Sequence, residues 1–281
     1  MHSSLVIWPI VALLVFFGFR VLTGNGVIAQ AIRTARAMNT AMAAYRIGDY
    51  DTALQKAEGL KGTSTTAEYC FFRGSVLHHL GRFDEAEASL RQGLPLEEDP
   101  RQKALVYNSL ASVLMDQRRF PEAIAFFENA GRAWPGRGSN QSGIAEVWLR
   151  QGRELPEALE HARQAVDIDR RATGMKKEAL DSRLGEDLVI MAWAVAANSG
   201  DVREVESLLS EAFPLCGTKT RPVLAQIHYH AGKAYEALRI TQKTREHFRQ
   251  AIEADPKGNF ARLVRGALVI VRQTTRSGQQ C

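Results

Sequence analysis

The sequence predicts an all-α solenoid of about six stacked helical hairpins, because one pattern of small and aromatic residues recurs along most of the chain. Residues 47–57 read IGDYDTALQKA, and thirty-three residues later residues 80–90 read LGRFDEAEASL. Equivalent positions recur at intervals of 33, 37, 35, 47 and 39 residues. These register positions are Ala53, Ala86, Ala123, Ala158, Val205 and Thr244. Periods of this length are typical of repeated pairs of helices.

The spacing within each repeat indicates close packing of two antiparallel helices. In the second repeat Gly74 precedes Ala86 by twelve residues, and Leu90 follows four residues later. Small residues at the first two positions let the helix backbones approach, and the larger residue fills the groove toward the next hairpin. Six repeats fit this spacing, two of them loosely.

The turn between the two helices has its own residue preferences. Gly48 and Gly81 lie where a left-handed backbone would follow the end of the first helix. Asp51 and Asp84 lie where we expect the N-cap of the second helix, whose side chain accepts a backbone hydrogen bond. Each repeat is therefore predicted to be a helix, a tight turn and a second helix.

The repeats are predicted to occupy residues 34–257. Pro135 and Pro256 each lie twelve residues after a register position and should end a second helix. Residues 170–185 depart from the period, so they form either an insertion or a longer helix.

The last part of the chain, residues 258–281, is predicted to be a capping helix with a basic tail. Apolar residues recur at helical spacing over residues 258–273, which favours a helix that covers the exposed end of the stack. From Lys257 onward there are five basic residues and no acidic one, which accounts for the net charge of +5. The rest of the chain is neutral overall, so we expect no nucleic-acid partner.

An apolar segment stands near the start of the chain. Residues 5–22 contain a single charged residue, Arg20, and as a helix they would extend about 27 Å, close to the roughly 30 Å hydrocarbon core of a bilayer. We therefore expect residues 1–24 to be a single-pass membrane anchor and residues 25–33 a linker. A cleaved signal peptide is the main alternative, because residues 29–31 resemble a cleavage site. A buried soluble helix is the other.

The distribution of charge predicts the orientation of this anchor. Arg20 lies near the end of the apolar segment and Arg33, Arg36 and Arg46 follow it, whereas no lysine or arginine precedes it. By the positive-inside rule the repeats should lie on the cytoplasmic side. The three cysteines are widely spaced and odd in number, as expected of reduced thiols.

The repeats resemble the tetratricopeptide repeat family. The best matches to that family's pattern are YNSLASVL with FPEAIAFFENAGRAWP, and HYHAGKAY with HFRQAIEADP. The resemblance covers about residues 34–256, with Trp193 and Thr244 as departures at positions for small residues. It implies a right-handed superhelix with a concave surface that binds proteins or peptides.

The motifs of common enzyme classes are absent from the sequence, so we predict neither an enzyme nor a cofactor or metal site. It contains no GxxxxGK[ST], HExxH, CxxC or GxSxG pattern. His228 and His230 are two residues apart and should face opposite sides of a helix. Of the adjacent His78 and His79, at most one should face the concave groove.

The first helices of the repeats supply the predicted partner-binding groove. Its residues are Met38, Met42, Tyr45, Phe71, Ser75, His78, Asn108, Ser112, Met115 and Tyr229. Methionine and aromatic side chains suit a groove that accepts a helix or an extended segment. Alternatively, Met38, Met42 and Phe71 pack between the first hairpins, or the continuation of the anchor covers them.

The predicted function is accordingly that of a membrane-anchored scaffold or adaptor. It would present this groove to partner proteins or peptides in the cytosol, and self-association is a further possibility. The alternative is an exported, soluble repeat module that is released by signal-peptide cleavage.

Overall fold

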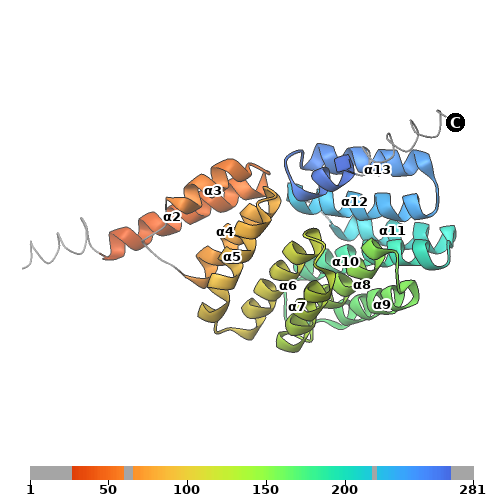
Figure 1. Cartoon of the computed structure of the whole chain (residues 1–281), viewed down its shortest axis with the longest axis horizontal. Helices are drawn as coiled ribbons and strands as arrows, with labels where there is room; N and C mark the ends of the chain where they lie inside the picture. The colour runs from red at the N-terminus through yellow and green to blue at the C-terminus, as the bar shows by residue number, and fades with distance from the viewer. Residues whose placement is uncertain (1–26, 60–65, 217–219, 267–281) are drawn as a thin grey trace, which may run out of the picture.

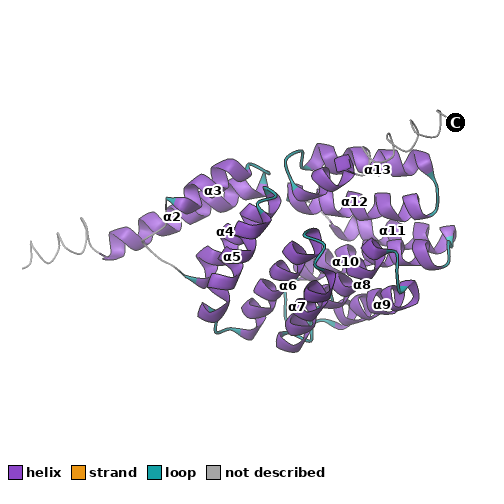
Figure 2. Cartoon of the chain, in the orientation of Figure 1, coloured by secondary structure: helices purple, strands orange, loops and turns teal. Residues whose placement is uncertain are grey.

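A computed structural model describes residues 27–59, 66–216 and 220–266, which consist of α-helices and short connections (Figures 1 and 2). In these ranges twelve α-helices follow one another as six hairpins. The pairs are α2 (Val27–Arg46) with α3 (Tyr50–Glu58), α4 (Ala67–His79) with α5 (Phe83–Gly93), α6 (Pro100–Asp116) with α7 (Phe120–Ala133), α8 (Ser139–Gln151) with α9 (Leu155–Arg171), α10 (Lys177–Asn198) with α11 (Val202–Cys216), and α12 (Arg221–Ala237) with α13 (Thr241–Ala254). A 3₁₀ turn, η1 (Leu94–Leu96), follows α5. The predicted all-α solenoid of about six hairpins is confirmed.

The hairpins pack through the small residues that define the repeat. Five of the six register residues are fully inaccessible to solvent, and Thr244 is half-buried. A Cβ atom on Gly74 would lie 2.6 Å from Cγ of Leu90, which explains why a side chain is excluded there. Between hairpins, a Cβ on Gly143 would lie 2.3 Å from Phe127, so this phenylalanine does fill the groove toward the next repeat.

Each hairpin turn contains a residue with a left-handed backbone. Glycine takes this position in four turns, including Gly48 and Gly81 with φ of 75° and 76°, as predicted. In the other two turns the position is held by Arg118 and Arg239, with φ of 62° and 61°. The turn geometry is therefore common to all six hairpins even where the sequence does not contain glycine.

The predicted N-cap residues are both wrong by two positions. Helix α3 is capped by Asp49, whose side chain accepts a hydrogen bond from the backbone N–H of Thr52. Asp51 lies inside the first turn, and its carboxylate pairs with the ammonium of Lys257 at 2.8 Å. Asp84 likewise lies inside α5, which begins after Arg82 without a side-chain cap. The negative charges of the two aspartates still stabilise the helices, because the N-terminus of a helix is positively polarised.

The boundaries of the second helices agree with the positions of the prolines. Helix α7 ends at Ala133 and α13 at Ala254, each two residues before the predicted proline stop. Residues 170–185 contain a longer helix, because α10 starts at Lys177 and runs for 22 residues. Helix α2 starts at Val27 and so includes most of residues 25–33, which we had assigned to a linker.

The chain curves until its C-terminal segment meets its first hairpins. A helical stretch at residues 259–266 follows α13 and packs on it, as expected of a cap. Residues 255–262, which include the start of this stretch, also touch hairpins one to three, and Figure 1 shows the blue end of the described chain beside the orange turns of α2 to α4. The capping helix therefore does more than cover an exposed end, since it joins the two ends of the solenoid.

The predicted membrane span at residues 5–22 lies outside the described residues. Among the helices that the structure does describe, none combines the length and the apolarity needed to cross a bilayer.

The turns at Arg118 and Arg239 generate a stability prediction. A non-glycine residue with a left-handed backbone is strained, and both arginine side chains are exposed. We expect Arg118→Gly and Arg239→Gly each to raise the free energy of unfolding by about 1 kcal/mol in urea titrations. Gly200→Ala is the matched control, because it introduces this strain at φ 69° in open space and should destabilise. A loss of stability in both arginine variants would contradict this account.

Candidate functional site

The concave side of the solenoid contains a partly open cavity of about 210 Å³. Its lining comes from every hairpin except the fifth, and from the C-terminal segment. The lining residues are Tyr45, Ser75, His78, His79, Leu90, Ser109, Ser112, Val113, Met115, Asp116, Glu146, Arg150, Pro222, Val223, Gln226, Asn259 and Phe260. Polar groups are prominent among them.

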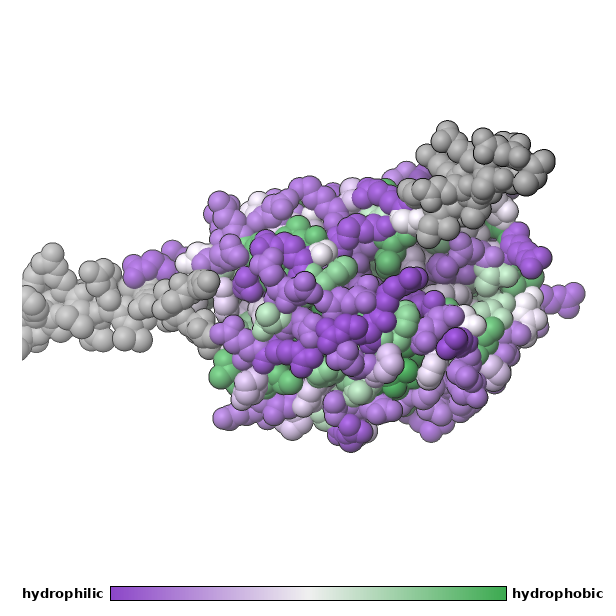
Figure 3. Space-filling view, in the orientation of Figure 1, coloured by the Kyte–Doolittle hydropathy of each residue, from purple (hydrophilic) through white to green (hydrophobic). Residues whose placement is uncertain are grey.

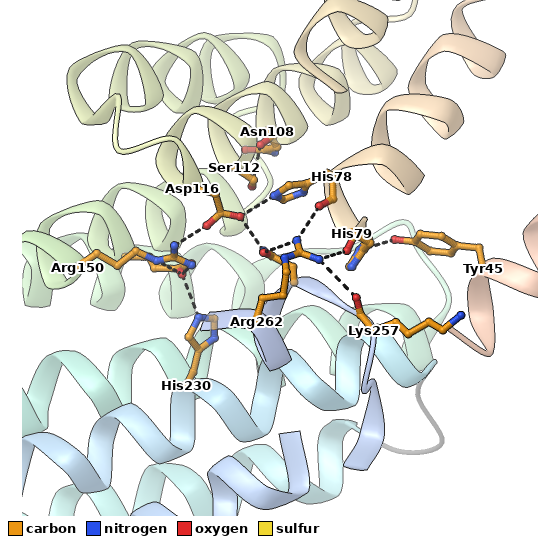
Figure 4. A network of polar contacts seen from close by, with 12 residues as sticks. Tyr45, His78, His79, Asn108, Ser112, Asp116, Arg150, His230, Lys257 and Arg262 are labelled. Atoms are coloured by element: carbon orange, nitrogen blue, oxygen red, sulfur yellow. Dashed lines mark hydrogen bonds and ion pairs between the residues drawn. The ribbon is translucent and has the colours of Figure 1, made fainter. Parts of the chain in front are cut away.

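Asp116, at the end of α6, is the centre of a polar network in this cavity. Its carboxylate accepts contacts from Arg150 at 2.6 Å and from Nε2 of His78 at 2.7 Å. The side-chain amide of Asn259 donates to the same carboxylate at 2.7 Å. Figure 4 shows His78 and Arg150 reaching Asp116 from two different helices. Because its side chain is only 2% exposed, these partners replace the water that a carboxylate requires.

Arg150 links Asp116 to a second buried carboxylate. Glu146 lies one turn before Arg150 on α8, and the two side chains pair at 2.6 Å. His230, on α12, is fully buried and lies 3.2 Å from the same carboxylate. The network therefore runs from α6 through α8 to α12 and fixes the relative position of these helices.

The shared guanidinium sets the charge state of both acids. Burial is the largest influence on the pKa of Asp116 and Glu146 and raises both. The attraction of Arg150 outweighs burial only together with the contacts of His78 at Asp116 and of His230 at Glu146 and with the hydrogen bonds that these partners make. The pKa of Glu146 falls to about 2, and that of Asp116 also lies well below its ordinary value. Burial lowers the pKa of Arg150, but the two carboxylates raise it more. All three groups are thus ionised at neutral pH.

His79 forms a second, neutral part of the lining. Its Nε2 lies 2.9 Å from the hydroxyl of Tyr45, and its ring stacks on Tyr50 with centroids 4.8 Å apart. Residue 79 as a whole is half-buried, yet its Nδ1 is inaccessible and has no hydrogen-bond partner among the described residues. Burial, together with the nearby His78 and Arg262, lowers the pKa of His79 to about 3.

The structure brings together half of the predicted groove residues. Tyr45, Ser75, His78, Ser112 and Met115 line the cavity. The expectation that at most one of two adjacent histidines faces the groove is wrong, because His79 lines it as well as His78. Adjacent residues of a helix point about 100° apart, but both histidines lie in the last turn of α4, where both side chains reach the cavity.

The other five predicted residues lie elsewhere. Met38 and Phe71 are half-buried against the core of the first hairpins, as the packing alternative proposed. Met42 is 36% exposed. Asn108 donates its side-chain amide to Asn140 at 2.8 Å, and Tyr229 is buried against Phe260.

Sequence reasoning missed the charged residues of the cavity. Asp116 is four residues after Ser112 and therefore on the same face of α6, so helical periodicity could have found it. Glu146 and Arg150 are also four apart, on the first helix of the fourth repeat. We had extended the groove through the apolar positions of the first repeats, whereas its centre is polar.

The remaining histidine predictions can be assessed directly. His230 faces the cavity network, whereas His228 lies against His247 with their Nδ1 atoms 3.1 Å apart. The prediction that His228 and His230 point to opposite sides is confirmed. Over the part of the chain that the structure describes, no group of three His, Cys, Asp or Glu residues could hold a metal ion.

Comparison with family models identifies the repeat. Two models, each described as a tetratricopeptide repeat, match residues 38–103 and 108–173 in one case and residues 225–257 in the other. Together they cover more than half of the chain. The protein belongs to the tetratricopeptide repeat family, and a comparison with curated protein sequences found no match.

Solved structures with the same architecture share little sequence identity with this chain. Yeast Tom70 superposes with a TM-score of 0.51 at 17% identity, over 84% of this chain and 47% of that one. The apo form of RapI gives a TM-score of 0.50 at 14% identity, over 80% and 98% of the two chains. YrrB, described as a TPR protein with an unusual peptide-binding site, gives 0.39 at 18% identity, over 71% and 91%. At such identities the likeness concerns the fold alone.

The buried, neutral His79 generates a pH prediction. Its folded pKa of about 3 lies below the ordinary value of about 6.5, so below pH 6.5 the unfolded chain binds more protons. The stability from this group is full above pH 6.5 and is lost progressively toward pH 3. The unfolding free energy of the wild type should fall when the pH is lowered from 7 to 5. We expect this fall to be about 2 kcal/mol smaller in His79→Gln.

Urea titrations of both proteins at the two pH values would measure this difference. His247, whose pKa is also lowered by burial, to about 4, remains in both proteins and contributes to the residual dependence on pH. An unchanged fall in stability in the variant would show that His79 is already protonated in the folded protein at pH 5.

Proposed function

We propose that this protein is an interaction module that binds an extended segment of a partner protein in its concave cavity. The observation that carries the proposal is the mixed lining, in which Ser75, Ser112 and Gln226 lie near apolar Met115 and Phe260. An extended segment offers backbone N–H and C=O groups along its length together with alternating side chains. Hydroxyl and amide groups can satisfy that backbone, and the apolar groups can receive its side chains.

The charged network should contribute more to selectivity among partner segments than to the strength of binding. Asp116 and Arg150 are held by several partners each, so they present fixed charges at little further cost in ordering. A hydrogen bond from a polar group of the partner to this network would fix the position of the partner segment along the cavity. A partner segment without such a group would leave the buried charges less well solvated, which favours discrimination.

The face of the molecule drawn in Figure 3 gives less support for another binding site. Hydrophilic residues cover most of the face visible in Figure 3, and hydrophobic residues there form scattered patches. Scattered apolar residues are ordinary on soluble domains. The concave cavity therefore remains the favoured place for a partner.

Blocking the cavity tests the proposed function. Ser112→Trp should fill it and abolish most of the partner recovery in affinity capture from the native cell extract. Ser210→Trp is the matched control, because residue 210 is exposed on α11 and outside the cavity lining. Circular dichroism and thermal unfolding would show that both variants are folded. Equal recovery of the same partners by the two folded variants would place the binding site elsewhere.

We propose further that residues 5–22 anchor this module in a membrane, with the repeats on the cytoplasmic side. Support comes from the apolar segment itself, from Arg20 near its end and from the three arginines that follow it. The exported, soluble form released by signal cleavage is the alternative.

Fractionation of the native protein tests the anchor. We expect the full-length chain to stay in the membrane pellet after carbonate extraction and to be digested by protease added on the cytoplasmic side. Release of the intact chain into the supernatant would contradict anchoring, and protection from the protease would contradict the orientation. The intact mass of the mature protein distinguishes a retained anchor from a cleaved signal peptide.

A further inference from the structure

The C-terminal segment, residues 255–262, connects the last hairpin to the first three. The contacts across this junction are hydrogen bonds and an ion pair. They join Asp255 to the hydroxyl of Tyr50, Lys257 to Asp51 at 2.8 Å, Asn259 to Asp116 at 2.7 Å, and Arg262 to the carbonyl oxygens of His78, at 3.1 Å, and His79. Figure 4 shows Arg262 reaching the end of the helix that carries the two histidines.

On its other side the segment is held by apolar packing. Ala261 and Val264 are fully buried, and the rings of Phe260 and Tyr229 lie 5.3 Å apart. The segment is thus attached firmly to the last hairpin and by polar groups to the first ones. The side chains of Asp51 and Lys257 are 66% and 61% exposed, and exposed ion pairs contribute little to stability. The junction with the first hairpins is therefore the more polar of the two, with this exposed ion pair beside the buried contact of Asp255 with Tyr50.

The turns of the first two hairpins fit this segment closely. A Cβ atom on Gly81 would lie 3.0 Å from the guanidinium carbon of Arg262, and one on Gly48 would lie 3.0 Å from Asp255. At Gly152 and Gly200, in later turns, a Cβ would meet nothing within 4 Å. Glycine in the first two turns thus serves both the left-handed backbone and the approach of the C-terminal segment.

The surface that receives the segment favours cations. The carbonyl groups of His78 and His79 belong to the C-terminal end of α4, where the helix dipole is negative. Asp51 and Asp116 flank this end in the junction. Lys257 and Arg262 supply the complementary positive charges, five residues apart in one segment.

The closed cavity is small for a peptide. Its volume of about 210 Å³ lies below the roughly 300–1,000 Å³ typical of ligand pockets. Because Asn259 and Phe260 line it, separation of the segment from the first hairpins would widen it.

We propose that residues 255–262 act as an intramolecular ligand that closes the cavity, and that a basic segment of the partner opens it by taking the place of Lys257 and Arg262. This inference rests on the proposed function and specifies the chemistry of the partner. The partner binds Asp51 and the carbonyl end of α4 through two cationic side chains.

The first experiment measures closure without any partner. Ser112→Cys places a thiol in the cavity lining, and Cys281→Ser removes a second reactive thiol, while Cys70 and Cys216 are buried. In this full-length background we measure the rate of labelling by fluorescein maleimide. Lys257→Ala with Arg262→Ala should raise the rate about tenfold, because labelling follows the population of the open state.

The matched control removes another surface ion pair. Arg170 and Glu211 pair at 2.8 Å between α9 and α11, with side chains 48% and 43% exposed, away from the junction. Arg170→Ala with Glu211→Ala should leave the labelling rate unchanged. Equal rates in the junction and control variants would overturn the closure.

The second experiment tests the chemistry of the partner with a defined probe. The probe is a fluorescent peptide with the sequence of residues 255–266, DPKGNFARLVRG, and its binding is followed by anisotropy. The Lys257→Ala, Arg262→Ala protein should bind it about tenfold more tightly than the wild type, whose own segment competes. A peptide with glutamate in place of Lys257 and Arg262 should bind to neither protein.

The outcomes of this experiment are decisive in both directions. Equal affinity of the two proteins for the peptide, or binding of the charge-reversed peptide, would overturn the inference. Neither experiment uses a cellular partner, so a failure of partner capture in the Ser112→Trp test would bear on the proposed function alone.

Discussion

The buried carboxylate of Asp116 is the interaction on which the arrangement of the concave side depends. It joins the second, third and fourth hairpins and the C-terminal segment through His78, Arg150 and Asn259. A carboxylate removed from water is costly unless its lone pairs are satisfied, and here several donors satisfy them. Because these donors come from separate elements, the elements must keep their relative positions for the charge to be tolerated. The polar centre thereby selects one curvature of the solenoid among those that the apolar packing would allow.

The local structure was predictable because its determinants are periodic. Small residues such as Gly74 and Ala86 recur at a fixed spacing, and this spacing alone defines the hairpins. The contact of Tyr50 with Asp255 is different, because the two residues are 205 positions apart and no repeat relates them. The closure of the chain on itself follows from the summed rotation of six hairpins. Small errors in each rotation accumulate, so sequence spacing cannot supply that sum.

The candidate site was predictable in part for a similar reason. Ser112 and Met115 were found because the concave face of a first helix follows helical periodicity. Asp116 was missed because a charged residue at the end of a helix is ordinarily solvated, and its burial depends on Arg150 from another repeat. Met42 was included because its residue type suits a groove, yet it lies on an exposed face. Residue type identified candidates, whereas the tertiary partners determined which of them line the cavity.

The contact between the two ends of the chain has a consequence for how this architecture can evolve. In an open solenoid each repeat touches only its neighbours, so a repeat can be gained or lost with little effect on the others. Here the last hairpin carries Asp255 to Tyr50 in the first. Duplication or deletion of an internal hairpin would add or remove one rotation and carry these residues away from each other. The number of repeats is thus constrained as in a closed ring, although the polypeptide itself is linear.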